Sequence, residues 1–415
     1  MNSRTIRDVV HVAVGVVVVA AVLQTWLVLG WIVPVTVSGS SMAPALLGPH
    51  RLYRCNGCQA EFAVGLDQLP LGEYAMCTHC GQRRTTAAAS PDRRGERIAV
   101  DRTAFAWREP HRWEVVVFRC PENASDLCVK RVVGLPGETI SLDGGDVLID
   151  GQVVRKSLAE QLVMRLPVDI TGEVNDVRTM QVGDVQCRTS SHWLRNDSTQ
   201  LDYHPVHDEA ISDEFNCNQG VTPPANRVTD VMLTFDARLA GAGKLVLKAA
   251  TDAGRCNVTV DFSQGEITLR RDGRTAARRP LTAAKAGLGR SSEWTFSLFD
   301  RQVLLAIGND VLLAEPWERD KQPSGELVPP LAIGFRGLKG EIRRLAVWRD
   351  VFYALRHGDG RQVGAERDGA ATWRLGSGEF FVLGDNAAIS DDSRSWPAGP
   401  GLDAKLLIGK PLGVR

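Results

Sequence analysis

A long apolar run near the amino terminus limits what this chain can fold into. The run extends from Val9 to Val37 and is interrupted by His11, Gln24 and Thr25. An apolar helix of about 20 residues spans a bilayer, whereas the apolar part of a cleaved signal peptide has about 7 to 15 residues. We therefore predict one transmembrane helix over residues 9–33. A buried helix of a soluble protein is the alternative.

The charges beside this run predict its orientation. Arg4 and Arg7 precede it, and the positive-inside rule places such residues in the cytoplasm. Residues 1–8 are then a cytoplasmic amino terminus. Everything after Pro34 would lie on the outer, periplasmic side of the cytoplasmic membrane.

Two segments beyond the run hold candidate catalytic residues. Ser41 lies in VSGSSMAP, a few residues after the run, and Lys130 opens KRVVGLPG. A serine hydroxyl needs an adjacent base, and a lysine serves as that base only when its amine is neutral. Val129, Val132 and Val133 predict a buried strand around Lys130, and burial lowers the pKa of a lysine. Together the two residues suggest a Ser/Lys dyad.

A third segment, GDNAAISDDSRSW at 384–396, follows the predicted strand Glu379–Leu383. With these three segments in this order, the chain resembles the bacterial type I signal peptidases, which are membrane-anchored Ser/Lys proteases that remove signal peptides from exported proteins. The resemblance covers residues 5–54, 93–156 and 375–410, and Gly95–Val100 corresponds to the family's strand before the lysine hairpin.

The resemblance implies a role for each matching residue. Ser41 would be the nucleophile, Lys130 the general base, and Ser390 the hydroxyl that orients the lysine amine. The supporting positions are Gly39 and Met42 beside the nucleophile, Arg131 beside the base, Asp385 and Asn386 in the opening turn of the Gly-Asp-Asn box, and Asp392 and Arg394 as an ion pair beneath the site. No cofactor is expected for catalysis.

The chain departs from the family pattern at two places. Ala387-Ala388-Ile389 stands where many relatives have Arg-Asp-Asn, and Gly39 stands where some relatives have a serine that donates into the oxyanion hole. The hole would then depend on the Ser41 backbone N–H, alone or with a neighbouring amide, and losing one such donor typically costs about 3 kcal/mol. Ser40 is an alternative nucleophile.

Four cysteines between the candidate nucleophile and base form two Cys-x-x-Cys pairs: Cys55, Cys58, Cys77 and Cys80. This spacing is typical of a structural zinc site, in which four thiolates leave no open position for catalysis. We predict a zinc-ribbon-like insert over residues 55–86 that folds around the metal. Disulfides are the alternative, because the segment would face an oxidising compartment.

Cys120 and Cys128 flank the loop between two predicted strands, Val115–Phe118 and Val129–Val133. Opposite positions of a hairpin can meet disulfide geometry. We therefore expect that these two cysteines either form a disulfide or do not pair with each other. The other cysteines are Cys187, Cys217 and Cys256, and at least one of these is free or paired elsewhere.

Residues 157–352 differ in character from the segments on either side. After a polar stretch to about Asn226, short alternating strands recur with turn signals, which favours a β-sandwich. The predicted strands are Val231–Phe235, Lys244–Lys248, Asn257–Phe262, Ile267–Arg270, Trp294–Phe299 and Val303–Ile307. The closing segment, 340–351, resembles the last strand of a laminin-G or concanavalin-like jelly roll. The ends of this insert should lie close together.

The predicted fold class is mainly β, with one amino-terminal transmembrane helix, a signal-peptidase-like catalytic core and an inserted β-sandwich. The core would consist of 34–54 with the nucleophile, 87–156 with the base and 353–415 with the Gly-Asp-Asn box. Within 87–156, Asp150-Gly151 between two apolar runs predicts a two-residue hairpin turn.

Composition narrows the expected partners. The 49 basic residues balance the 49 acidic ones, and no Lys/Arg-rich run is present, so we expect no nucleic acid partner. The expected partners are membrane lipid and exported preproteins with an Ala-x-Ala pattern. The sandwich is either a spacing or docking module or binds a protein or glycan. Two other functions compete: a catalytically degenerate, membrane-tethered scaffold, and a self-cleaving repressor relative.

Overall fold

The structure is a computed structural model. It describes residues 3–24, 29–54, 61–68, 74–76, 83–85, 91–170, 180–182, 202–207, 211, 213, 226–251, 254–281, 288–317, 331–355, 366–367 and 370–414. The helices in these ranges are α1 (Ser3–Leu23), α2 (Leu29–Trp31) and α3 (Leu158–Met164), and the other regular elements are mostly strands. The prediction of a mainly β fold is confirmed.

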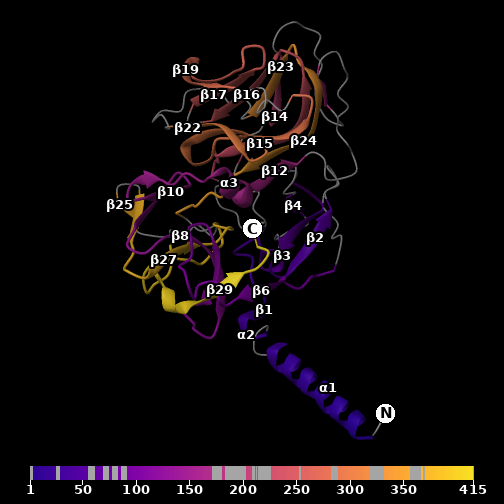
Figure 1. Ribbon diagram of the computed structural model, residues 1–415. Coiled ribbons are helices and arrows are strands. Elements are labelled where there is room, and N and C mark those ends of the chain that lie inside the picture. Colours follow the sequence, from indigo (N-terminus) through magenta and orange to yellow (C-terminus); the bar gives the residue numbers. More distant parts are fainter. Residues whose placement is uncertain are drawn as a thin grey trace.

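The apolar amino-terminal run is not one helix. Helix α1 projects away from the rest of the molecule (Figure 1), and its valines from Val9 to Val22 are 50% to 67% exposed. It ends at Leu23, and strand β1 (Ile32–Thr36) begins before the predicted helix end at residue 33. Pro34 has no N–H with which to continue a helix, and the β-branched residues around it favour a strand.

The predicted transmembrane helix over 9–33 therefore needs correction. Strand β1 pairs antiparallel with β6 (Arg97–Asp101), so the end of the run belongs to the sheet of the core. Among the helices of the described residues, none has the length and apolarity that crossing a bilayer requires.

Two sheets make up the core that carries the candidate site. The larger has the order β1-β6-β29-β7-β8-β27-β28, and the smaller has the order β11-β10-β9-β26-β25. The strands not yet located are β7 (Val115–Arg119), β8 (Leu127–Gly134), β9 (Thr139–Asp143), β10 (Asp146–Ile149), β11 (Gln152–Val153), β25 (Glu366–Arg367), β26 (Ala370–Arg374), β27 (Glu379–Leu383), β28 (Leu402–Asp403) and β29 (Leu407–Pro411).

The local turn chemistry explains one hairpin of this core. Strands β10 and β11 pair through Ile149 and Gln152, and the two residues between them have positive φ, 49° at Asp150 and 80° at Gly151. Such φ values are those of a two-residue type I′ hairpin turn. The Asp-Gly prediction is confirmed.

Two further sheets lie above the core in Figure 1 and share one apolar interior. Their orders are β12-β24-β15-β20-β21-β22, with β13 also paired to β24, and β14-β23-β16-β17-β18-β19. The strands are β12 (Leu166–Ile170), β13 (Met180–Val182), β14 (Asp202–His207), β15 (Val231–Ala240), β16 (Lys244–Thr251), β17 (Gly254–Asp261), β18 (Glu266–Arg271), β19 (Arg274–Pro280), β20 (Ser291–Ser297), β21 (Gln302–Ile307), β22 (Asp310–Pro316), β23 (Leu331–Arg336) and β24 (Lys339–Arg349).

The ends of this sandwich meet. Strand β12 pairs antiparallel with β24, and Leu166 lies opposite Arg349, which confirms the prediction that the insert begins and ends at one place. Two predicted strands were too long at their ends. Phe262 lies just beyond β17, and Phe299 does not continue a strand but begins the 3₁₀ turn Phe299–Arg301. Asp300 and Arg301 have positive φ in that turn, and this reverses the chain before β21.

Buried charges join the sandwich to the core at this turn. The Lys156 ammonium, 3% exposed, lies 2.5 Å from an oxygen of Asp300 and 2.8 Å from an oxygen of Asp350. Arg301 lies 2.8 Å from the Asp146 carboxylate at the start of β10. Burial alone lowers the pKa of Lys156, but the two carboxylates more than offset this and raise its pKa.

The cysteine-rich insert is described in part. Strand β2 (His50–Arg54) pairs antiparallel with β3 (Glu61–Gly65), and β4 (Tyr74–Met76) pairs antiparallel with β5 (Arg83–Thr85). The predicted zinc ligands Cys55, Cys58, Cys77 and Cys80 lie outside the described residues, as do Cys187 and Cys217. Cys256 is a buried free thiol.

Candidate active site

The segment that carries Ser41 is a tight turn anchored by apolar side chains. Residues 40–46 follow strand β1 as consecutive turns, and Val37, Met42 and Leu46 are buried in one cluster with Ile98 and Val100 of β6. Because Met42 is fully buried, its neighbour Ser41 is held at the edge of the core, where it is half-buried.

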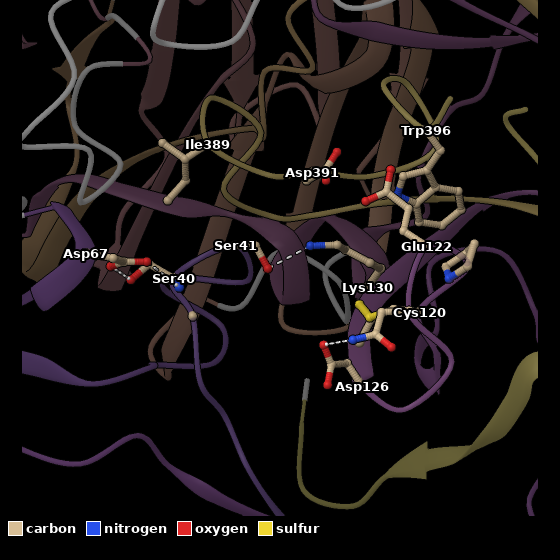
Figure 2. Close-up of a pocket in the computed structure, with 14 residues that line it drawn as sticks. Ser40, Ser41, Asp67, Cys120, Glu122, Asp126, Lys130, Ile389, Asp391 and Trp396 are labelled. Carbon is tan, nitrogen blue, oxygen red and sulfur yellow. Dashed lines mark hydrogen bonds between the residues drawn. A yellow bond between two sulfur atoms is a disulfide. The ribbon is translucent and has the colours of Figure 1, made fainter. Parts of the chain in front are cut away.

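Lys130 reaches Ser41 from the middle of the large sheet. Strand β8 lies between β7 and β27. As in any strand, its successive side chains point to opposite faces of the sheet. The Lys130 ammonium nitrogen, Nζ, is 2.7 Å from Ser41 Oγ, and Lys130 is 5% exposed. Figure 2 shows the lysine amine directed at this hydroxyl. The structure therefore brings together the two residues of the predicted dyad.

Burial sets the protonation of this lysine. Desolvation lowers the pKa of Lys130 to about 8; nearby Asp392 and Asp391 raise it, and Arg394 lowers it. An ordinary lysine has a pKa of about 10.4, and each unit is about 1.4 kcal/mol. A lysine with a pKa of 8 is neutral in roughly a tenth of molecules at pH 7. The neutral amine is the form that accepts a proton.

Arg131, the residue after the base, is held in a buried ion pair. Its guanidinium points to the opposite face and makes two hydrogen bonds, of 2.7 and 2.6 Å, to the Asp385 carboxylate, with both side chains buried. A third bond, of 2.7 Å, goes to the Trp113 carbonyl. This pair joins β8 to the Gly-Asp-Asn box.

The box holds the backbone of the nucleophile segment. The Asn386 N–H donates to the Ser41 carbonyl at 3.0 Å, and Asn386 Nδ2 donates to the Ser40 carbonyl at 3.0 Å. A side chain at Gly384 would collide with the Ser41 carbonyl and with Ser390 Oγ. The first and third positions of the box are therefore fitted to the turn that carries Ser41.

Ser390 lies beside this turn but not in the predicted contact. It is fully buried, and its N–H donates to the Asn386 carbonyl at 3.0 Å. Its Oγ makes no hydrogen bond within the described part of the chain, so the predicted bond to the Lys130 amine is not formed in this structure.

Asp392 and Arg394 form a fully buried ion pair, with Arg394 Nε 2.8 Å from Asp392 Oδ1. Burial by itself raises the pKa of Asp392, but Arg394 holds it below its usual value. Arg394 also donates to the Ala387 carbonyl at 2.8 Å, and Asp392 accepts from the Gly384 N–H at 3.1 Å. The pair thus holds the opening turn of the box at Gly384 and at Ala387, where the sequence departs from the family pattern.

A pocket of about 370 Å³ opens beside the dyad (Figure 2). Its walls are the segment Gly39–Ser41, the loop that begins at Pro121, and the side chains of Ile389, Asp391 and Trp396. A disulfide joins Cys120 to Cys128 at the base of that loop, with their Cα atoms 5.4 Å apart. The disulfide closes the loop and thereby fixes one wall.

Ser40 is directed away from the lysine. Its hydroxyl donates to Asp67 Oδ1 at 2.5 Å, and its backbone N–H donates to Asp67 Oδ2 at 3.2 Å. Figure 2 shows the Ser40–Asp67 contact and the Ser41–Lys130 contact as separate pairs. Ser41 is therefore the serine that contacts the base. The sequence analysis did not identify Asp67, because its neighbours in the sequence form no recognisable motif.

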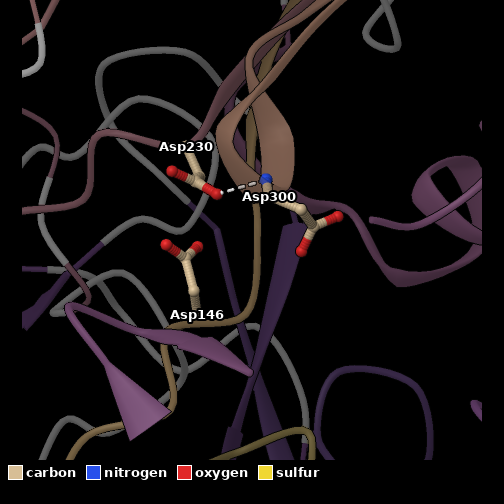
Figure 3. Close-up of side chains that lie close together, drawn as sticks. All are labelled: Asp146, Asp230 and Asp300. Atoms are coloured by element: carbon tan, nitrogen blue, oxygen red, sulfur yellow. Dashed lines mark hydrogen bonds between the residues drawn. The ribbon is translucent and has the colours of Figure 1, made fainter. Parts of the chain in front are cut away.

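One group of carboxylates has the spacing of a metal site. Asp146, Asp230 and Asp300 offer oxygens within 4.8 Å of one another (Figure 3). Lys156 pairs with Asp300, and Arg301 pairs with Asp146. Asp230 accepts the Asp300 N–H at 2.7 Å. Since each carboxylate has a partner within the protein, we assign the group to the junction between core and sandwich.

Comparison with protein families relates part of this chain to the signal peptidases. The model of the family described as "Signal peptidase, peptidase S26" matches residues 77–199, a segment that includes Lys130 but neither Ser41 nor Ser390. A signal peptidase I of Leptolyngbya laminosa is 33% identical over 69 residues, 15% of this chain and 34% of that protein. The signal peptidase I V of Bacillus subtilis is 29% identical over 68 residues, 16% of this chain and 39% of that protein. The matches span little more than a third of these relatives.

Solved structures resemble parts of this chain only weakly. A carbohydrate-binding module, CBM66, from Bacillus subtilis has 8% identity and a TM-score of 0.22, and the match covers 28% of this chain and 74% of that one. The galectin LEC-6 of Caenorhabditis elegans has 9% identity and a TM-score of 0.23, over 35% and 89% of the two chains. At these scores we draw no conclusion from either.

Proposed function

We propose that this protein is a serine endopeptidase that removes signal peptides from exported preproteins, with Ser41 as nucleophile and Lys130 as general base. The observation that carries the proposal is the 2.7 Å hydrogen bond between Lys130 Nζ and Ser41 Oγ, made by a lysine that is 5% exposed. A scaffold that had lost catalysis would have no need for a buried lysine against a serine.

The chemistry follows from the dyad. Neutral Lys130 takes the proton of Ser41 as Oγ attacks the scissile carbonyl, and then returns it to the leaving amine. Water, deprotonated by the same lysine, then releases the acyl group from Ser41. The Ser41 N–H donates to no other group within the described residues, and it supplies the oxyanion donor.

The substrate would bind as an extended strand with small side chains before the cut, as in the Ala-x-Ala pattern. Backbone hydrogen bonds to a sheet edge give affinity in this mode of recognition. The exposed valines of α1 support a location of the protein at the membrane. We propose that the catalytic core lies on the outer face of that membrane. Cell fractionation with and without residues 3–24 tests this location.

The test of activity is cleavage of a preprotein carrying an Ala-x-Ala site by the full chain in detergent. Ser41→Ala and Lys130→Ala should each lower the rate by at least roughly 1,000-fold. Matched controls are Ser38→Ala and Lys405→Ala, since Ser38 is exposed and the Lys405 side chain is 91% exposed. Full cleavage by either dyad variant would show that another residue is the nucleophile or the base.

We also propose that Cys55, Cys58, Cys77 and Cys80 hold a structural zinc ion. The support is the strand pairing around them: Arg54 pairs with Glu61 and Met76 pairs with Arg83, so each Cys-x-x-Cys pair lies in the connection between two paired strands. Metal analysis of purified protein should give one zinc per chain. Absence of zinc together with loss of four free thiols would favour disulfides.

The sandwich has no proposed ligand of its own. Its binding of a protein or glycan stays a prediction of the sequence, and screening on glycan and peptide arrays tests it.

A further inference from the structure

Asp67 makes a two-point contact with the residue before the nucleophile. One carboxylate oxygen accepts the Ser40 hydroxyl at 2.5 Å, and the other accepts the Ser40 backbone N–H at 3.2 Å. The carboxylate thus fixes the Ser40 side chain and one end of the peptide unit that leads into it. Ser40 itself is 3% exposed, so the contact lies at the inner wall of the pocket.

The hairpin that carries Asp67 is shaped for this contact. Asp67 follows β3 in a short 3₁₀ turn, Leu66–Gln68, and the Leu66 N–H donates to the Pro49 carbonyl at 2.8 Å. A Cβ at Gly65 would collide with Ser40 Oγ and would come within 2.5 Å of Asp67 Oδ1. Only glycine at position 65 leaves room for the Ser40 hydroxyl beside the carboxylate.

The Ser40–Ser41 segment is consequently held on two sides. Asp67 takes the N–H and the hydroxyl of Ser40, whereas Asn386 takes the carbonyls of Ser40 and Ser41. The peptide N–H of Ser41 lies between these four hydrogen bonds and is directed by them. It is the group to which the proposed mechanism gives the oxyanion.

We infer that Asp67 is a positioning residue for catalysis, which orients the Ser41 N–H through Ser40 and keeps the Ser40 hydroxyl away from the dyad. This inference rests on the proposed function. Gly39 offers no side-chain donor to the oxyanion, so the direction of the remaining backbone donor controls the rate. The cysteine-rich insert then supplies a side chain to the active site.

The conservative variant separates geometry from charge. In Asp67→Asn, Oδ1 can accept the Ser40 N–H while Nδ2 donates to the Ser40 hydroxyl, which is both donor and acceptor. Asp67→Leu has a similar size and makes neither bond. Gly65→Ala perturbs the same contact by collision. Asp92→Asn is the matched control, because Asp92 pairs with Arg51 of strand β2 at the exposed side of the same hairpin.

The experiment measures kcat and KM on a signal-peptide substrate across pH 6–10. Removing an oxyanion donor costs about 100- to 1,000-fold, so misorienting it in Asp67→Leu should lower kcat by roughly 10- to 100-fold with KM within about 2-fold. Asp67→Asn should stay within about 3-fold of the wild type, and Gly65→Ala should resemble Asp67→Leu. The pH at which the rate falls should not move, because the Lys130 amine keeps its surroundings.

A second readout does not depend on the peptide substrate: acylation of Ser41 by an activated ester, followed by intact mass, with Ser41→Ala as blank. Slower acylation in Asp67→Leu supports the positioning role even if no signal peptide is cleaved. Acylation of Ser41 without any cleavage of a signal peptide would overturn the proposed substrate but not the positioning role. Normal kcat and normal acylation in a folded Asp67→Leu, or a loss in Asp67→Asn as large as in Asp67→Leu, would overturn the positioning role. A wild type inert in both assays would overturn both proposals.

Discussion

The acid limb of the pH–rate profile should report the ionisation of Lys130, and a charge at the rim of the pocket should move it. The perturbation is Asp391→Asn. Asp391 lines the pocket, is exposed, and raises the pKa of Lys130. The amide keeps the oxygen that accepts from the Ser395 hydroxyl while removing the negative charge. We therefore expect the pKa of Lys130 to fall in the variant.

The structure sets the size of both effects. With a pKa of about 8, neutral Lys130 is about 200- to 300-fold more abundant at pH 7 than in an ordinary lysine. In the wild type kcat/KM should rise about tenfold per pH unit below 8 and level off above it. An exposed carboxylate at the rim shifts a neighbour's pKa by roughly 0.3 to 0.5 units at low salt, so the variant should be about 2- to 3-fold faster at pH 6 and unchanged at pH 9.

The assay is kcat/KM on a fluorogenic peptide with alanines before the cut, measured from pH 5.5 to 10 at low salt and again at 1 M salt. The difference between variant and wild type should shrink at 1 M, where the Debye length is about 3 Å. Asp403→Asn, an exposed carboxylate on β28 outside the pocket, is the control. If the acid limb of the wild-type profile lies near pH 10, burial does not lower the pKa of Lys130. If the acid limb of Asp391→Asn stays in place or moves to higher pH, the charge of Asp391 does not raise that pKa.

Three other changes test the framework around the site. Asp385→Ala should lower the free energy of unfolding by roughly 3 to 5 kcal/mol in denaturant titrations, because Arg131 is left charged and buried; a loss below 1 kcal/mol would contradict this. Replacing Cys120 and Cys128 together by serine should lower the free energy of unfolding by about 2 to 3 kcal/mol and make activity insensitive to reductant. If reductant does not change wild-type activity, the disulfide does not fix the pocket wall in the way we describe. Lys156→Met should destabilise the fold more at pH 8 than at pH 5, since its two buried carboxylate partners lose their charge only on acidification; an equal loss at both pH values would count against this ion cluster.

Local patterns in the sequence predicted much of the fold. A valine-rich run predicted the strand around Lys130, alternating residues predicted the strands of the sandwich, and Asp150-Gly151 predicted a hairpin turn. Side-chain period and turn preference act within a few residues, so local sequence is enough for them. The same patterns misplaced the end of the amino-terminal helix. The apolar run reads alike as helix or strand, and only pairing with β6 decides that residues 32–36 belong to the sheet.

The sequence by itself thus determined which segments carry the chemistry: a serine after an apolar run, a lysine within a valine-rich strand, and a box rich in small and charged residues. Only the tertiary structure decided which groups meet. Lys130 and Ser41 are 89 positions apart, Ser40 and Asp67 are 27 apart, and Arg131 and Asp385 are 254 apart. Contacts at such separations arise when sheets close around a common core, and no local preference encodes them.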